Sequence, residues 1–186
     1  PAATKVVGNN SIGSSEINVD NSFDFSSNDL VMIVTMYDGD NRNSSNRAGL
    51  YELRRVISSS AGKLVFNKPL ENTYNASNTQ GHQVVKVMEY NNLTIDGTLT
   101  VSAWDGEMGG VMAISCSGDL TLNGTIDLKG KGYRGGKVTN ESVWLDGHPG
   151  EGNYGFISGH SDVPNGIGGA GGDSSSSSLY GGNAGG

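Results

Sequence analysis

The sequence predicts an all-β protein: a small β-barrel or sandwich first, then a short β-solenoid-like repeat and a glycine-rich tail. Two observations indicate this class. Short apolar runs with β-branched residues recur between turn-forming residues, whereas apolar residues never keep the period of an amphipathic helix for three turns. One short phrase also occurs twice. We expect three parts, which are a compact β domain at 1–90, a repeat region at 91–136 and a tail at 137–186.

The first part contains a series of strand-like runs separated by glycine, asparagine and proline. The longest apolar run lies at 30–37, and it has the length and β-branching of a buried strand. Asn28-Asp29 before it and Lys68-Pro69 further on are typical turn residues. Further strands are expected at 6–7, 17–19, 50–57, 63–66 and 83–88.

The second part is organised around the repeated phrase. Residues 93–101 (LTIDGTLTV) return as 120–128 (LTLNGTIDL), an offset of 27 residues. Leucine and β-branched residues alternate in both copies, which is typical of strands with one buried face. An Asp-Gly or Asn-Gly pair lies at the same point in each copy, and we expect it to supply positive φ angles at a tight turn.

The phrase allows two interpretations, two β-hairpins or two stacked rungs of a solenoid. The offset lies within the ~20–50 residue range that usually indicates stacked repeats. A further apolar run at 111–116 gives one period three strands. These observations favour the solenoid.

The tail is rich in glycine and carries a run of five serines at 174–178. Few aliphatic residues are present, so such a segment gains order only by packing against something else. We expect residues 166–186 to act in assembly.

Charge and hydropathy exclude several classes of protein. A net charge of −7 with only 12 basic residues argues against nucleic-acid binding. No apolar run approaches the ~20 residues that span a bilayer, so membrane insertion is not expected. The single cysteine, Cys116, is expected in the core. A start at Pro1 without a methionine is expected for a mature secreted chain, although an artificial boundary would look the same.

Several segments together carry a resemblance to a known family. They include Trp104-Asp105-Gly106 and the glycine-rich stretch Gly132-Tyr133-Arg134-Gly135-Gly136. Over roughly 20–136 the chain resembles the N-terminal module of glycine-rich secreted bacterial surface proteins, the adventurous-gliding-motility and adhesin-like proteins. The resemblance implies an extracellular structural role at the cell surface and no catalytic residues. The short tail departs from the long arrays of that family and suits a small subunit that assembles with itself.

Metal sites have two candidate locations. The segment from Asp38 to Asn43 is rich in oxygen ligands, but Arg42 at the fifth and Asn43 at the sixth position break the EF-hand pattern. Calcium at a looser site is the one cofactor that the sequence leaves open. The tail also holds carboxylates and histidines in a spacing that matches no zinc signature; they are Asp146, His148, Glu151, His160 and Asp162. We expect no metal site, and His82 is expected at the surface.

Carboxylates near the repeat raise the question of catalysis. Asp105, Glu107, Asp119 and Asp127 are the candidates for glycoside cleavage, which needs two carboxyl groups ~5–10 Å apart. Asp105 and Asp119 adjoin glycines, where turn formation explains an aspartate. The sequence therefore predicts no enzyme.

Aromatic residues are the better candidates for function. Rings in glycine-rich loops stack on sugars or anchor interfaces, although packing over the β core is the alternative. The candidates for assembly or ligand contacts are Trp104, Tyr133, Trp144, Tyr154, Phe156 and Tyr180.

These observations favour a non-enzymatic extracellular structural protein that self-assembles into a fibre or sheath through its β edges and tail. Its partners would be copies of itself, with surface glycans as a further class. The alternative is a carbohydrate-binding adhesin module, and a polysaccharide-acting β-helix enzyme comes third.

Overall fold

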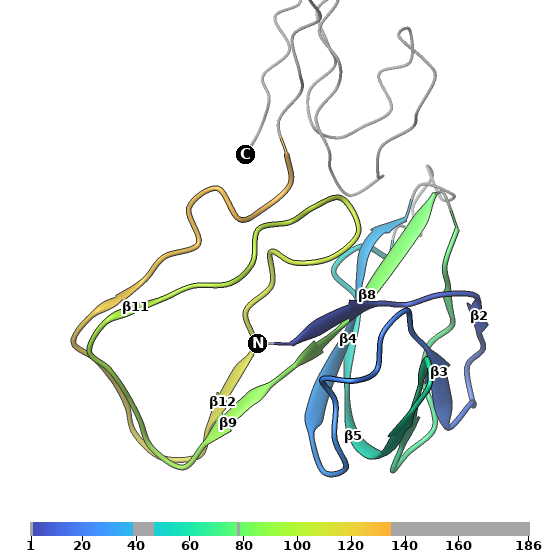
Figure 1. The fold of residues 1–186 in the computed structure, drawn as a ribbon, viewed down its shortest axis with the longest axis horizontal. Helices are drawn as coiled ribbons and strands as arrows, with labels where there is room; N and C mark the ends of the chain where they lie inside the picture. Colours follow the sequence, from blue (N-terminus) through green and yellow to red (C-terminus); the bar gives the residue numbers. More distant parts are fainter. Residues whose placement is uncertain (1, 39–46, 78, 135–186) are drawn as a thin grey trace, which may run out of the picture.

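The computed structural model describes residues 2–38, 47–77 and 79–134, which form an all-β fold (Figure 1). Figure 1 shows two units side by side, a curled sheet and an open loop of two stacked chain passes. The all-β prediction is confirmed, and a glycine-rich tail at 137–186 lies outside the described residues.

The first unit is a six-stranded antiparallel sheet in the order β1-β8-β4-β5-β6-β3. The sheet curls until the chain beyond its two edge strands meets, because Val6 bridges Val19 and the Val7 N–H donates to the Asn18 carbonyl over 3.0 Å. The unit is therefore barrel-like, with both edge strands engaged. Its strands are β1 (Ala3–Lys5), β3 (Glu16–Asn18), β4 (Leu30–Asp38), β5 (Tyr51–Ser60), β6 (Lys63–Phe66) and β8 (Gln80–Lys86).

Two kinds of residue fill the barrel interior. One part is apolar and fully buried, with Ile17, Ile33, Leu64, Phe66 and Val84 among its members. The other part is polar, and most of its buried groups bond to each other or to the backbone, as buried polar groups usually do. Its members include Thr35, Asp38, Glu52, Arg54, Gln80 and His82. The Glu52 Oε1 atom is the exception, since it has no hydrogen-bond partner among the described residues.

A small two-stranded pair closes this polar end. It consists of β2 (Asn9–Asn10) and β7 (Tyr74–Asn75), which run antiparallel. The buried Asn10 amide donates to the Val7 and Tyr74 carbonyls, and its oxygen accepts from the Asn18 N–H over 2.7 Å. One side chain thus joins three segments of the barrel wall.

The second unit consists of two solenoid rungs with three strands each. The first rung holds β9 (Met88–Tyr90), β10 (Leu93–Ile95) and β11 (Thr98–Leu99), and the second holds β12 (Ile114–Cys116), β13 (Leu120–Leu122) and β14 (Thr125–Ile126). Each strand pairs in parallel with its counterpart, and Leu93 lies opposite Leu120. Parallel pairing at the repeat offset confirms stacked rungs and excludes the two hairpins. The solenoid begins at Met88, slightly before the expected boundary at residue 91.

The corner glycines differ from the expectation. Neither Gly97 nor Gly124 has a positive φ, so the predicted turn chemistry is wrong. Glycine is needed at Gly124 for another reason, because a Cβ there would lie 2.0 Å from the Gly97 carbonyl oxygen. Glycine is therefore required at this corner by the close approach of the two rungs and not by the turn. The Asn123 amide also donates to the Asp96 carboxylate over 2.9 Å, which links the two corners.

Candidate functional site

The two units meet at the outer face of the barrel, under a loop that connects the two rungs. Gln83 is fully buried there, and its side-chain amide both donates to the Gly109 carbonyl over 3.0 Å and accepts from the Gly109 N–H over 2.9 Å. A side-chain amide that bonds to both the N–H and the carbonyl of one residue fixes the loop on the barrel wall.

Aromatic rings complete this junction. Trp104 is 4% exposed and meets Tyr37 of the barrel edge-on at 6.4 Å and Tyr133 at 5.6 Å between ring centroids. The Tyr133 hydroxyl donates to the Met36 carbonyl. Trp104, proposed from the sequence as an exposed contact, is therefore buried inside the chain, and Tyr133 contacts the barrel.

The same loop carries a charged side chain towards the barrel. The Asp105 carboxylate accepts hydrogen bonds from the N–H groups of Glu107 and Met108, each over 2.9 Å. Burial acts to raise the pKa of Asp105, but these bonds outweigh it and hold that pKa below its ordinary value. Glu107, held by this turn, forms a 2.9 Å ion pair with Lys5. The hydrogen bond that the Lys5 ammonium donates to Glu107 raises the pKa of Lys5.

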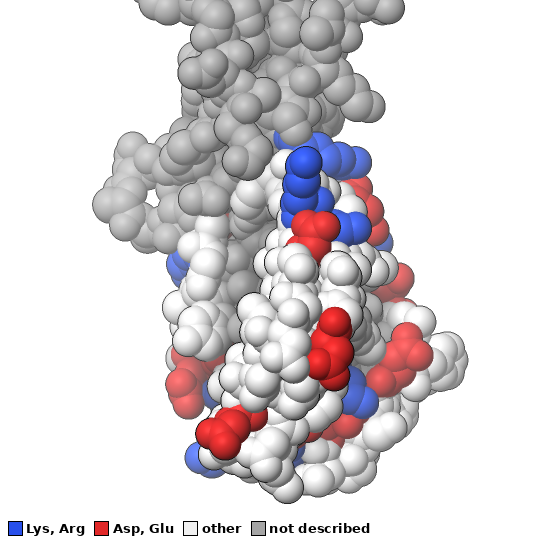
Figure 2. Space-filling view, turned by 90° about the vertical axis from the view of Figure 1, so that its left-hand side faces the viewer, with Lys and Arg blue, Asp and Glu red and all other residues white. Residues whose placement is uncertain are grey.

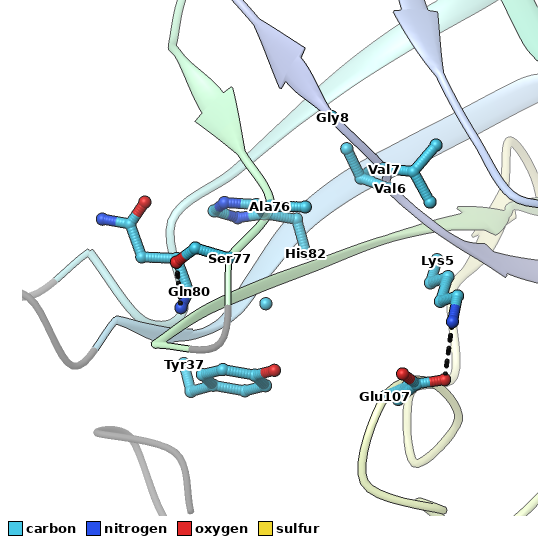
Figure 3. A pocket seen from close by; sticks show the side chains of 11 residues that line it. Lys5, Val6, Val7, Gly8, Tyr37, Ala76, Ser77, Gln80, His82 and Glu107 are labelled. Atoms are coloured by element: carbon cyan, nitrogen blue, oxygen red, sulfur yellow. Dashed lines mark hydrogen bonds and ion pairs between the residues drawn. The ribbon is translucent and has the colours of Figure 1, made fainter. Parts of the chain in front are cut away.

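A pocket of about 250 Å³ lies beside this ion pair (Figure 3). Its walls come from β1, the start of β8, the end of β4 and the connecting loop. Figure 3 shows the Tyr37 ring on one side, the Lys5–Glu107 pair at one end, and Ser77 and Gln80 towards the other.

Tyr37 is placed in this pocket by a β-bulge. The register of β4 against β8 shifts between Thr35 and Tyr37, which brings Tyr37 opposite Gly81 on the outer face. The ring covers Gly81, since a Cβ on that glycine would lie 2.2 Å from the Tyr37 ring. Bulges commonly redirect a side chain in this way. An aromatic ring that packs over a cross-strand glycine is also held in position.

His82 forms part of the pocket wall from inside the barrel. It is fully buried, so the expectation of a surface residue is wrong. Its Nε2 lies 3.3 Å from the Asn75 carbonyl, which can only accept, so Nε2 carries the proton and Nδ1 accepts from the Thr35 hydroxyl. Burial lowers the pKa of His82 to about 4, so this residue of the wall is uncharged at neutral pH.

The second candidate site is the far face of the second rung. Its apolar side chains are exposed, with Leu120 and Leu122 both at 52%. Ile95, the first-rung counterpart of Leu122, is only 7% exposed, because the second rung covers one side of it. Ile126 and Leu128 are exposed in the same way. These four side chains leave apolar surface exposed along the second rung.

The opposite face of the stack is hollow. A cavity of about 260 Å³ is lined only by first-rung residues, among them Met88, Leu93, Ile95 and Leu99. A Cβ on Gly97 would meet nothing within 4 Å. Figure 1 shows the barrel beside the loop that the rungs enclose, not over it. Both faces of the two-rung stack are thus open within the described part of the chain.

The remaining predicted contacts, Trp144, Tyr154 and Tyr180, lie outside the described residues, as do Phe156, the tail histidines and most of the calcium-loop candidate. Asp38 at its start is buried, and its carboxylate accepts from Gln80 and Arg47. Among residues 2–38, 47–77 and 79–134 no group of three acidic, histidine or cysteine side chains could hold a metal ion.

Three of the carboxylates considered for catalysis, Asp105, Glu107 and Asp127, form local structural contacts. Asp105 forms the turn described above, and the Asp127 carboxylate accepts from the Lys129 N–H over 2.9 Å. Cys116, expected in the core, is only half-buried in the second rung, where its thiol donates to backbone carbonyls.

Charged side chains are dispersed over the solenoid side of the molecule. Figure 2 shows that face as largely uncharged, with separate acidic and basic groups and no continuous basic stripe. No helix capable of crossing a membrane occurs in the described part of the chain.

Comparison with known proteins gave only distant structural similarity. No protein family matches the sequence, and no curated protein matches it. The chain is similar to the Gp54 tailspike of Acinetobacter baumannii bacteriophage AP22, solved in complex with A. baumannii capsular saccharide, with a TM-score of 0.39 and 14% identity over 68% of this chain and 24% of that one.

Two Pseudomonas phage tailspikes are similar at the same level. For gp49 of phage LKA1 the TM-score is 0.34, with 18% identity over 53% of this chain and 17% of that chain. For gp61 of phage phi297 it is 0.36, with 12% identity over 68% and 31%. The chain spans less than a third of the length of each tailspike.

Proposed function

We propose that the protein is a non-enzymatic structural protein of the cell exterior that stacks head to tail with copies of itself into a fibre. The observation that carries this proposal is the exposed apolar face of the second rung. Exposed apolar strips of this kind mark interaction sites, and a strand with unpaired edge groups is a template for another chain. The low proportion of charged residues and the abundance of small polar residues support an extracellular location.

A second copy is the occupant that fits this face. Within the chain, the second rung already packs on the first with matched strands and corners. A partner that covers the exposed face of the second rung should therefore have the shape of a rung. The first rung of another copy has this shape, and its open face is hollow. The same contact that joins the rungs inside one chain would then join two chains. Such a heterologous contact does not close on itself and gives an open filament.

Gly97 provides separate support. Nothing in the described structure needs a glycine there, since its φ is not positive and the space beside it is open. Glycine in a strand region costs about 0.5–1 kcal/mol relative to alanine. Gly124 is needed because a rung lies close above it. Stacking of a neighbouring copy on the first rung would place the same demand on Gly97.

The first test is negative-stain electron microscopy and sedimentation of the full chain and three variants. Leu120→Asp with Leu122→Asp places charge on the stacking face, and we expect filaments to disappear. Thr121→Asp is the matched control, because it lies on the other face of the same strand, and we expect it to assemble. Gly97→Ala is expected to leave the single chain folded and to prevent assembly.

The outcomes separate the possibilities. Added at low ratio, the Leu120→Asp/Leu122→Asp variant should terminate wild-type filaments, since its first rung remains intact. Monodisperse wild-type protein would overturn stacking. So would filaments that persist in both the Leu120→Asp/Leu122→Asp variant and the Gly97→Ala variant. Truncation before Gly166 distinguishes a tail contact, because filaments carried by the rungs survive it.

A further inference from the structure

We infer that the pocket between the barrel and the connecting loop binds one residue of a neutral glycan. This site is separate from the stacking face, and the inference does not depend on assembly. It rests on the chemistry of the pocket walls, which combine a fixed aromatic ring with charged groups of both signs.

The aromatic wall is prepared for a ligand. Tyr37 is only half-buried, and its ring is held on Gly81 and by the edge of Trp104. A ring that is already fixed loses little conformational freedom when a ligand packs on it. The apolar C–H face of a sugar is a partner for such a surface, since Tyr combines a flat apolar body with a polar tip.

The Lys5–Glu107 pair supplies polar contacts. An ammonium group has three donor positions, and the bond to Glu107 uses one of them; an ionised carboxylate accepts at several positions. Neighbouring sugar hydroxyl groups both donate and accept, so they can bridge the two charges. Hydrogen bonds to charged groups contribute more than bonds between neutral groups.

Charge selects a neutral ligand. The ion pair has no net charge, His82 in the wall is neutral, and the whole chain carries −7. An acidic glycan would approach a protein of its own sign and find a lysine already neutralised by Glu107. The volume of about 250 Å³ is near the lower end of ligand pockets, which suits a single sugar ring.

The pocket also lies between two units that fold from distant parts of the sequence. Lys5 belongs to β1, whereas Glu107 comes from the loop that Gln83 holds on the barrel. Binding at this place depends on the docked junction and not on either unit alone.

The experiment is a glycan array that presents neutral hexose and N-acetylhexosamine oligosaccharides beside uronic-acid and sulfated ones. The full chain is applied first, and each glycan that is retained is then titrated by calorimetry. We expect retention of at least one neutral glycan. Lys5→Gln and Glu107→Gln should each weaken binding at least about tenfold, because each removes a charged partner of the sugar hydroxyls.

Matched variants serve as controls. Glu16→Gln and Lys63→Gln break a similar exposed ion pair elsewhere on the barrel and should bind as the wild type does. Tyr37→Phe keeps the ring and should retain binding, whereas Tyr37→Leu should lose it. The stacking variant Leu120→Asp/Leu122→Asp should bind with unchanged affinity per chain.

Three results would overturn the inference: no neutral glycan retained, acidic glycans bound in place of neutral ones, or wild-type affinity in both Lys5→Gln and Glu107→Gln. Circular dichroism of each variant establishes that it is folded. The two charge variants keep the test decisive even if Tyr37→Leu disturbs the barrel, since their side chains lie at the surface.

Discussion

The barrel and the solenoid use the same kind of strand and differ in what covers it. Leu64 in β6 is fully buried, whereas Leu122 in β13 is 52% exposed. The barrel curls until its edges meet and so supplies its own second layer. A solenoid rung is covered only by the next rung, and about three repeats are usually needed to bury a continuous core. A closed unit is complete by itself, and a stacked unit needs a neighbour.

The largest effect should come from the polar part of the barrel, where Arg54 pairs with Glu52 and both are buried. Removal of Glu52 leaves the buried Arg54 guanidinium with only the exposed Glu71 carboxylate as an ion-pair partner, so Glu52→Leu should lower the free energy of unfolding by about 3 kcal/mol. Chemical denaturation measures this loss. The double variant Glu52→Leu with Arg54→Met removes both charges, and a loss as large as in the single variant would contradict the explanation.

Acid should weaken the barrel next. The pKa of His82 is lowered to about 4, so the unfolded chain takes up a proton first as the pH falls below the ordinary value of 6.5. This contribution to stability is fully present above pH 6.5. As the pH falls from 6.5 to about 4, the barrel should lose about 3 kcal/mol of it. Denaturation at several pH values checks this, with His82→Gln as the comparison. The carboxylates with lowered pKa values, such as Asp29 and Asp38, act mainly below pH 4.

A parallel slope in wild type and His82→Gln would contradict the assignment to this histidine. Hydrogen exchange should place the acid effect in the amides of β4 and β8, which flank the buried ring, and leave the amides of β10 and β13 unchanged.

The solenoid should be destabilised by a methyl group added at the corner of the second rung, and not by one added at the corner of the first rung. Gly124→Ala places a Cβ against the Gly97 backbone, which cannot rotate away, and should destabilise the second rung by ~1–3 kcal/mol. Gly97→Ala is the matched change in the first rung, and it should leave the dilute single chain as stable as the wild type or up to about 1 kcal/mol more stable. Hydrogen exchange at β13 and β14 measures both. Equal effects at the two glycines would contradict the close-approach explanation.

The sequence predicted the strands and the stacking, because both depend on local pattern. Alternation at 93–101 and 120–128 and their equal spacing were sufficient for parallel rungs in register. The role of the corner glycines was predicted wrongly, since a turn and a close approach both demand glycine and only coordinates distinguish them.

The pocket between the barrel and the connecting loop was not predicted, since it combines residues from distant segments. Lys5 and Glu107 are 102 residues apart, and no periodicity links them. Tyr37 reaches the outer face through a bulge, which alternation does not show. His82 was expected at the surface because it precedes the predicted strand at 83–88, but the pairing of Thr35 with His82 places both inside. Trp104 was singled out as a contact, and its burial at the junction follows from the barrel that forms before it in the chain.

The bond from Tyr133 to the Met36 carbonyl has a consequence for the order of events during synthesis. Its partners are 97 residues apart, and ribosomes add ~5–20 residues per second. The last barrel strand ends at Lys86, 47 residues before Tyr133, so Tyr133 emerges roughly 2–9 s after it, a delay long enough for a small domain to fold. The barrel can therefore fold before the second rung has been synthesised. The second rung then packs against a barrel that is already folded.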